Sequence, residues 1–524
     1  MIKFENSPTA RLKTDEEILE TLFAKEERLE NYPTIPEFYN DQEIFITGGS
    51  GFIGKVLIEK LLRSCPGIKA IYILMRPKKG KDIAERLKVI TDLELFEPLR
   101  QNNPELFTKL VPVAGDVTEL QLGLSKNDLD RMKNVSVIFH SAASVRFDDS
   151  LKYAIMMNTR GTREIMRFAE TLKNIKVVMH VSTTYSNPHL RTVEEQVHQA
   201  PVDWRTAIDI CENANEDHLN SLTQHYTKFM PNTYVFSKSL AEHVTDDYKE
   251  KLPVVIFRPS IVISAIKEPL PGWVDNFNGP VGLLVGSGIG IVRTMYSNPD
   301  NRCDFLPVDV CVKGMIIAAW KKGMEHDNSI PVYNCASYNV ATLKIQQIID
   351  IGKCLCAVTP LDNMLFIPGG HITNSRYSNY VKVIFYQLLP ALIIDGILKL
   401  KGHKTFMTKI QRKIYEANLA LRYFVMNEWI FKNDNFLTLC DKIKLEDLKE
   451  FDYRDCFNHD VIMYMRIAMR GVRKYLIHDN LENDERNRMK YKFLNVIHTL
   501  LCSVPYILLY FVLKILIFDK FWPQ

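Results

Sequence analysis

Residues Glu43 to Gly54 read EIFITGGSGFIG, and this stretch decides the fold. Residues 44–46 form a short apolar run of the buried-strand type, and 55–62 (KVLIEKLL) resumes with helical spacing. The glycines that fit the pattern G-x-G-x-x-G between them are Gly49, Gly51 and Gly54. Glycine at such a turn lets the backbone approach a pyrophosphate, which would bind the free amides at the helix N-terminus. Because the required strand and helix flank the pattern, the stretch predicts a dinucleotide-binding turn rather than an ordinary one.

Further apolar runs without polar alternation recur along the chain and are separated by helical segments such as 158–169. We expect strands at 68–75, 110–114, 135–139, 177–181, 254–257 and 332–335. Runs of this kind indicate parallel strands covered on both faces. The predicted fold class is therefore α/β, with a Rossmann-type doubly wound parallel sheet. Polar residues follow several of the runs, at the strand ends where open α/β sheets bind ligands.

The composition excludes several other classes of protein. A chain of 524 residues is long enough for two or more domains, and a net charge of +4 is too small to indicate nucleic acid as a partner. The ten cysteines include no C-x-x-C pair, so we expect no metal site. The first 30 residues are charged and lack the apolar region of a signal peptide.

The residue after the second predicted strand bears on the choice of cofactor. Folds that prefer NAD carry an acidic residue near this point, where it binds the ribose hydroxyls. This chain has Arg76, followed by Lys78 and Lys79. Cationic side chains at this position favour the 2′-phosphate of NADP.

The segment 234–238 (YVFSK) places a phenol and an ammonium four residues apart, on one face of a helix. We expect the ammonium of Lys238 to lower the pKa of Tyr234 and make it a usable proton donor. A hydroxyl from Thr183 or Ser182 would polarise a carbonyl beside the tyrosine. His140 follows the fourth strand and is given no catalytic role.

Several longer strings resemble the eukaryotic alcohol-forming fatty acyl-CoA reductases, a family of extended short-chain dehydrogenase/reductases. They are TGGSGFIGKVLIEKLL at 47–62, FHSAASVRFDDSL at 139–151, HVSTTYSN at 180–187, PNTYVFSKSLAE at 231–242, FRPSIV at 257–262 and GWVDNFNGPVGLLVGSGIG at 272–290. Together with the segment near PALIID at 390–395, they extend the resemblance from about residue 42 to 480, in the expected order.

The resemblance implies NADPH as the cofactor and a long-chain acyl-CoA as the substrate. By residue match it assigns catalytic roles to Tyr234 and Lys238, and a hydroxyl role to Thr183 or Ser182. HVSTTYSN has Thr184 where alanine is usual, so the choice of hydroxyl stays open. The cofactor contacts are assigned to Gly48, Gly51, Phe52, Ile53, Gly54, Arg76, Asp116, Val117, Ala142 and Lys238.

The expected reaction reduces the thioester to an aldehyde with loss of CoA, and then reduces the aldehyde to a primary alcohol. A membrane-bound hydroxysteroid dehydrogenase would share the same turn and Tyr-Lys pair and is the alternative. An inactive NADP-binding scaffold is a third possibility, although the intact pair argues against it. The oligomeric state is not predicted.

The expected organisation is a polar lead-in at 1–40, a reductase domain at 41–360 and a helical C-terminal domain at 361–480. The glycine-rich stretch 272–290 lines the acyl-chain entrance or is a packed loop. The apolar run 383–398 is short for a membrane span and could be buried or interfacial.

The run 496–518 has 23 residues and is long enough to cross a bilayer. Arg486, Arg488, Lys490 and Lys492 precede it, so we expect the catalytic domain to face the cytosol. The expected location is the membrane of the endoplasmic reticulum, with the peroxisomal membrane as the alternative, and membrane lipid is an expected partner.

Overall fold

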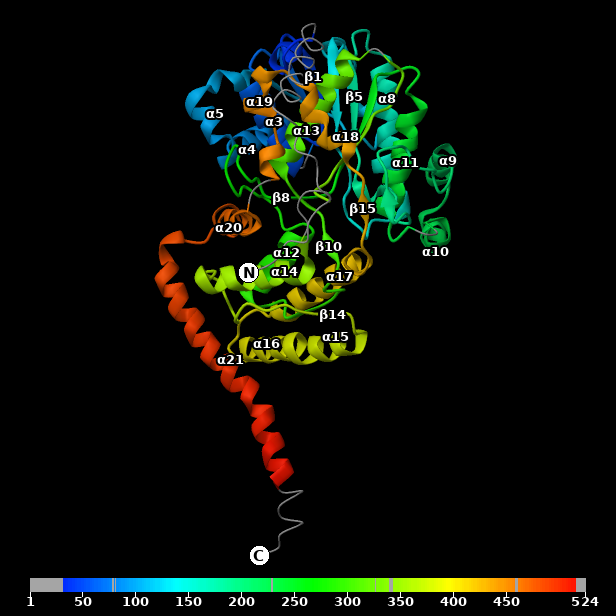
Figure 1. Ribbon diagram of the computed structural model, residues 1–524. Helices are drawn as coiled ribbons and strands as arrows, with labels where there is room; N and C mark the ends of the chain where they lie inside the picture. The colour runs from blue at the N-terminus through cyan, green and yellow to red at the C-terminus, as the bar shows by residue number, and fades with distance from the viewer. Residues whose placement is uncertain are drawn as a thin grey trace, which may run out of the picture.

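The computed structural model describes residues 32–514 apart from 78–79, 81, 228–229, 326, 339–342 and 458–459. Its centre is a parallel seven-stranded sheet in the order β12-β7-β5-β4-β1-β2-β3 (Figure 1). The strands are β1 (Glu43–Thr47), β2 (Ala70–Met75), β3 (Leu110–Ala114), β4 (Val135–His140), β5 (Val177–Val181), β7 (Val254–Pro259) and β12 (Val332–Cys335). The predicted α/β fold with a doubly wound parallel sheet is confirmed, and each expected strand is present.

The strand order reverses at β1. The chain first extends the sheet through β2 and β3, and then returns to add β4 on the other side of β1. In open α/β sheets, ligands bind in the crevice outside the carboxyl ends of the strands at this reversal. Thr47 and His140 end β1 and β4 side by side at that point.

Helices cover both faces of the sheet because the strands are apolar on both sides. Ile44 and Ile46 of β1 face one core, which contains α3 (Phe52–Ser64) and α13 (Val308–Met324). Phe45 faces the opposite core, which contains α8 (Gly161–Glu170) and α11 (Thr233–Asp247). This half also contains α4 (Ile83–Thr91), α5 (Glu97–Asn102), α6 (Lys126–Arg131), α9 (Trp204–Asn213) and α10 (Glu216–Thr227).

The helix predicted at 158–169 begins earlier than expected. Ser150 caps α7 (Leu151–Ala154) by accepting a hydrogen bond from the Tyr153 amide, and a π-helical turn (Ile155–Arg160) joins α7 to α8. This turn places Asn158 near the carboxyl end of β4, where its side chain amide donates hydrogen bonds to Ser144 and Ser237.

A second layer lies beyond the carboxyl edge of the sheet (Figure 1). It contains α12 (Pro280–Ile289), α14 (Ile345–Val358), α15 (Arg376–Val383), α16 (Leu389–Leu400) and α17 (Met407–Met426). Short parallel strand pairs belong to the same region: β8 (Ile261–Ile263) with β11 (Phe305–Pro307), and β9 (Thr294–Tyr296) with β14 (His371–Thr373). Much of the glycine-rich stretch 272–290 is therefore helical, since Pro280 starts α12 and Gly290 ends it with φ at 88°.

The C-terminal part of the chain returns to the sheet-covering helices. Side chains of α18 (Asp434–Leu437) and α19 (Leu445–Phe451) belong to the same apolar core as α3 and α13. At the N-terminal side, α2 (Ile35–Tyr39) also buries its apolar residues in this core.

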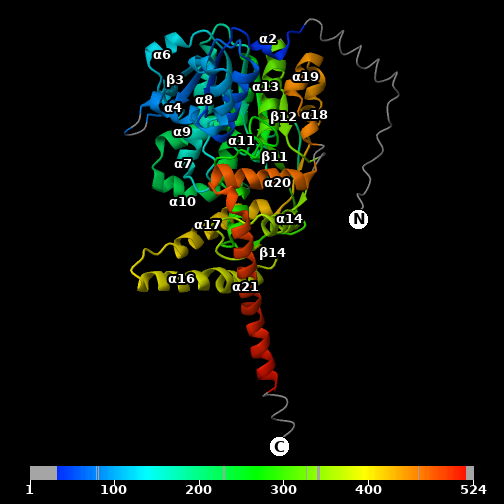
Figure 2. The same ribbon diagram turned by 90° about the vertical axis from the view of Figure 1, so that its left-hand side faces the viewer.

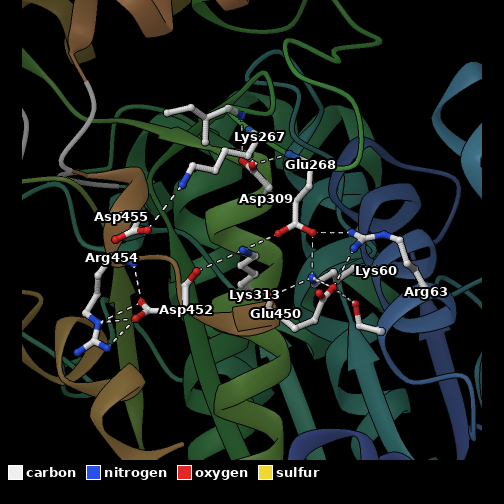
Figure 3. Close-up of polar contacts among 12 residues, drawn as sticks. Lys60, Arg63, Lys267, Glu268, Asp309, Lys313, Glu450, Asp452, Arg454 and Asp455 are labelled. Atoms are coloured by element: carbon white, nitrogen blue, oxygen red, sulfur yellow. Dashed lines mark hydrogen bonds and ion pairs between the residues drawn. The ribbon is translucent and has the colours of Figure 1, made fainter. Parts of the chain in front are cut away.

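A network of ion pairs fastens α19 to α3 and α13 (Figure 3). Glu268 accepts from Lys60 at 2.9 Å, from Arg63 at 2.6 Å and from Lys313 at 2.5 Å, and Glu450 of α19 accepts from Lys60 at 2.6 Å. Burial alone would raise the pKa of Glu268, but these three cations hold it at about 2. The carboxylate therefore stays charged and links three segments that are far apart in the sequence.

Two long helices bear on the prediction that the chain inserts into a membrane. Helices α15 and α16, joined by a π-helical turn, form one helix from Arg376 to Leu400 that is long and apolar enough to cross a membrane, with mean hydropathy 1.8 over an 18-residue stretch. Among the described residues no other helix meets both criteria. Helix α21 (Asp484–Leu513) covers most of the predicted span 496–518, and 515–518 lie outside the described residues. It extends past α16, away from the sheet (Figure 2).

Candidate active site

The glycine turn between β1 and α3 has two positions that cannot carry a side chain. Gly48 has φ at 75°, and a Cβ there would lie 2.7 Å from the Ala142 amide nitrogen. A Cβ on Gly54 would lie 2.3 Å from the carbonyl oxygen of Gly48. The absence of a side chain at Gly48 lets the turn pack against the end of β4, and its absence at Gly54 lets α3 pack against the turn.

This packing leaves the helix N-terminus open. The N-cap residue of α3 is Gly51, which has no side chain to cap the helix, so the amides of Phe52, Ile53 and Gly54 have no capping side chain. Free amides at the positive end of a helix dipole bind phosphate groups. The turn with α3 is thus suited to the pyrophosphate of a dinucleotide.

Arg76 and Asp116 lie together at the ends of β2 and β3. A guanidinium nitrogen of Arg76 is 3.8 Å from a carboxylate oxygen of Asp116, and the Arg76 side chain is 57% exposed. Asp116 also accepts a hydrogen bond from the Thr118 amide at 3.0 Å, while Val117 is buried. The three neighbouring strands β1, β2 and β3 therefore bring the turn, Arg76 and Asp116 to one edge. Lys78 and Lys79 lie outside the described residues.

Lys238 lies on α11, whose first turn is capped by the side chain of Asn232. Its ammonium is buried and donates a hydrogen bond to the carbonyl oxygen of Val181 at 2.6 Å. Burial lowers the pKa of Lys238 to about 8, and the nearby carboxylate of Glu242 opposes that shift. The ammonium is thus charged at neutral pH and bound to the end of β5.

Tyr234, one helical turn before Lys238, does not have the lowered pKa that its spacing from Lys238 suggests. Desolvation raises the pKa of Tyr234 to about 12, and only a hydrogen bond with the side chain of Thr183 acts in the opposite direction. The expectation is wrong because the phenolate loses more solvation than its neighbours replace. The phenol keeps its proton at neutral pH and remains a hydrogen-bond donor.

The two candidate hydroxyls at the end of β5 have different partners. Ser182 donates to a carboxylate oxygen of Glu242 at 2.6 Å, whereas the hydroxyl of Thr183 accepts from the Tyr185 amide at 3.3 Å and lies near enough to the phenol of Tyr234 to lower its pKa. Both side chains are buried. The structure therefore brings Thr183, rather than Ser182, to the phenol.

Glu242 and Arg258 support this arrangement and received no role from the sequence. Arg258 donates to the two carboxylate oxygens of Glu242 at 2.8 and 2.7 Å, and both side chains are buried. Burial would raise the pKa of Glu242, but the Arg258 guanidinium keeps it lowered. The spacing of four residues places Lys238 and Glu242 on one face of α11, and this spacing was the signal in the sequence that pointed to Glu242. Nothing in the neighbouring sequence indicates that its partner is Arg258 on β7.

His140 has a structural environment. Its two ring nitrogens lie 2.8 Å from the Thr47 hydroxyl and 3.1 Å from the Thr162 hydroxyl. Burial lowers its pKa to about 3, so the ring is neutral. Through the Thr47 contact it links the ends of β1 and β4.

These residues fit a bound dinucleotide at the crevice between β1 and β4. The amides of α3 suit its phosphates, Arg76 and Asp116 lie where the adenosine ribose would be held, and Lys238 lies at the other end of the edge. The Tyr234 phenol and Thr183 hydroxyl converge from α11 and β5. The arrangement can donate hydrogen bonds to a substrate oxygen beside a nicotinamide.

Comparison with known proteins agrees with this geometry. The family described as male sterility protein matches residues 46–315, and a second domain with the same description matches 386–479. Fatty acyl-CoA reductase wat of Drosophila melanogaster is 36% identical over 485 residues, covering 91% of this chain and 93% of that protein. Fatty acyl-CoA reductase 1 of Rattus norvegicus is 36% identical over 453 residues, covering 86% and 87%.

Solved structures support the fold. The terminal R domain of the myxalamid pathway is 18% identical, with a TM-score of 0.56 over 84% of this chain and 92% of that one. The R domain of a nonribosomal peptide synthetase from Mycobacterium tuberculosis is 18% identical, with a TM-score of 0.55 over 87% and 95%. The sequence relatives, together with the NAD(P)-binding Rossmann sheet, show that the chain belongs to the fatty acyl-CoA reductase family of the extended short-chain dehydrogenase/reductases.

Proposed function

We propose that this protein reduces a long-chain fatty acyl-CoA to a primary alcohol, with NADPH as the electron donor and an aldehyde as intermediate. The observation that carries the proposal is that α11 places Tyr234 one turn before the buried Lys238 at the carboxyl end of β5, with the Thr183 hydroxyl near the phenol. The family membership of the chain supports the choice of an acyl-CoA over other carbonyl compounds.

When bound, the nicotinamide cofactor supplies hydride. Tyr234 and Thr183 would hydrogen-bond the thioester oxygen and stabilise the negative charge that develops on it. The resulting hemithioacetal collapses, the carbon–sulfur bond breaks, and CoA leaves as the thiol. In the second reduction Tyr234 would give its proton to the alkoxide of the former aldehyde. Lys238 would hold the cofactor ribose, since its ammonium already lies at the end of β5.

The preference for NADPH over NADH rests on Arg76. This exposed guanidinium lies after β2, where an acidic residue would favour the ribose hydroxyls of NAD. Arginine binds a phosphate through charge-assisted hydrogen bonds and can do so with two at once. Replacing Arg76 with alanine should therefore raise the apparent KM for NADPH far more than that for NADH. Equal losses with the two cofactors would contradict the proposal.

The membrane attachment that we propose has two parts. The helix 376–400 packs on the protein along one stripe, where Gln387 accepts from the Arg293 and Thr294 amides and Asp395 accepts from the Met407 and Thr408 amides. The opposite face exposes large apolar side chains, which include Phe385, Leu388, Leu392, Ile393 and Ile397. A helix held in this way fits a position in the membrane interface rather than across the bilayer.

The second part is the C-terminal segment 496–518, which we propose crosses the membrane. The start of α21 is bound to the body of the protein, since Arg488 donates to the Val358 carbonyl and Lys490 to the Asp362 carbonyl, each at 3.0 Å. The catalytic part therefore lies on the side of the basic residues, which favours the cytosol. We propose the endoplasmic reticulum as the location, with the peroxisomal membrane as the alternative.

The proposal is tested by expressing the protein in cells that lack fatty alcohols and analysing their lipids. Fatty alcohols should appear with the wild type and be absent with Tyr234→Phe. Oxidation of an added 3β-hydroxysteroid without alcohol formation would favour the hydroxysteroid dehydrogenase instead. Loss of both activities with intact NADPH binding would indicate an inactive scaffold.

A further inference from the structure

Two apolar cavities lie in the second layer, beyond the carboxyl edge of the sheet. The larger has a volume of about 210 Å³ and the smaller about 110 Å³. Helices α12 and α14, which lie beyond the carboxyl edge of the sheet in Figure 1, contribute to both. The residues that line both cavities include Leu284, Ser287, Cys303, Phe305, Ile348 and Ile349. The two cavities are therefore neighbours with a common wall.

Aromatic rings connect the smaller cavity to Tyr234. Tyr185 and Phe424 line this cavity, with their ring centroids 5.4 Å apart. Phe424 lies 5.2 Å from Phe147, and Phe147 lies 5.9 Å from the ring of Tyr234. A row of aromatic rings in contact with one another thus extends from the phenol of Tyr234 to the smaller cavity, and an apolar surface of this kind suits a hydrocarbon chain.

The larger cavity adjoins the smaller one and is lined by residues of α14 and α20 (Val461–Gly471). On α14, Ile348, Ile349, Gly352, Leu355 and Cys356 all line it, at the spacing of one helix face. A Cβ built on Gly352 meets no atom within 4 Å. Glycine is unfavourable in the middle of a helix, so packing or function usually accounts for it there. At Gly352 the missing side chain leaves space free in the cavity.

We propose that the two cavities hold the acyl chain of the substrate, and that Gly352 sets its maximum length. The methylenes nearest the thioester follow the aromatic rings into the smaller cavity, and the methyl end reaches the larger one. The inference rests on the proposed function and adds the place where the chain binds. Each methylene that finds room should tighten binding by about fourfold, so loss of the far cavity penalises long chains selectively.

The test is Gly352→Leu in the purified full-length protein, assayed with NADPH and acyl-CoAs of graded chain length. The leucine should lower kcat/KM for the longest substrates at least tenfold and leave the shortest within about twofold. Leucine is a better helix former than glycine and has space here, so the fold should survive. Gly352→Ala should give a smaller shift in the same direction.

Gly396→Leu is the matched control. Gly396 lies in α16, and its Cβ would also meet no atom within 4 Å, but it lines neither cavity. This variant should keep the chain-length profile of the wild type. A Gly352→Leu profile that matches the wild type, or that falls equally at every length, would overturn the proposal.

A second readout does not need catalysis. A palmitic acid with a photoreactive diazirine near its methyl end should label α14 and α20 of the wild type, and Gly352→Leu should abolish that labelling. Labelling of α14 and α20 by a protein that reduces no acyl-CoA would keep the cavity assignment and reject the proposed function. Labelling elsewhere by an active protein would reject the cavity assignment alone.

Discussion

The guanidinium of Arg258 donates one hydrogen bond to each carboxylate oxygen of Glu242, at 2.8 and 2.7 Å, with both side chains buried. Arg258 belongs to β7 and Glu242 to α11, so the pair fixes the helix that carries Tyr234 and Lys238 to the sheet. Glu242 also accepts from Ser182, which orders the end of β5. One ion pair therefore orients three elements of the site.

Removing one partner of this pair should destabilise the protein strongly. Glu242→Gln leaves the guanidinium of Arg258 buried without its counter-charge, and the expected loss is about 3–5 kcal/mol of unfolding free energy. Urea unfolding measures it. The double variant Glu242→Leu with Arg258→Met removes both charges and should recover part of the loss. A single variant as stable as the wild type would show that the pair has no such role.

The two hydroxyls at the end of β5 should behave differently. Thr183→Val removes the partner of the Tyr234 phenol and should lower kcat by about 10²–10³-fold, as expected for loss of one oxyanion donor, with little change in melting temperature. Ser182→Ala removes a hydrogen bond to Glu242 and should act mainly on stability. Steady-state kinetics and thermal unfolding of both variants distinguish the roles. The reverse pattern would assign the catalytic hydroxyl to Ser182.

Cofactor affinity should depend on pH through Lys238. Its pKa is about 8, so the ammonium is charged below that pH and loses its proton as the pH rises. The dissociation constant for NADPH should be constant from pH 6.5 to 7.5 and rise above pH 8, by up to about tenfold per unit. Fluorescence titration measures it. Lys238→Arg keeps its charge and should remove this dependence. A flat profile in the wild type would contradict the assignment.

Truncation after Tyr491 tests the membrane proposal. The intact chain should resist carbonate extraction, because an inserted helix is effectively irreversible. The truncated chain should move partly to the soluble fraction and still bind NADPH, since every proposed cofactor residue precedes the cut. Leu392→Asp and Ile393→Asp on the exposed face of α16 should release more of the truncated protein. An intact chain that washes off as readily as the truncated one would refute the anchor.

The parts of this structure that depend on local sequence were predictable. The parallel strands follow from apolar runs, and the glycine turn follows from its spacing between a strand and a helix. The pKa of Tyr234 was not predictable, because its sign depends on burial at the phenol and not on the distance to Lys238 along the helix. The pair of Glu242 and Arg258 and the two cavities are formed by residues from separate elements, and no local pattern indicates them. The length of the helix 376–400 was underestimated because polar residues interrupt its apolar run in the sequence. In the structure these polar residues bind the rest of the protein.

The central claim is that Tyr234 acts in a reductase of long-chain acyl-CoA. The most direct measurement is to incubate the purified protein with palmitoyl-CoA and NADPH and to quantify hexadecanol, free CoA and NADPH consumption. The wild type should form hexadecanol and CoA in equal amounts with two NADPH oxidised for each. Tyr234→Phe should bind NADPH with unchanged affinity and lose about 10²–10⁴-fold in rate, because phenylalanine has no proton to donate. A Tyr234→Phe variant that forms hexadecanol at the wild-type rate, or a wild type that consumes no palmitoyl-CoA, would contradict the claim.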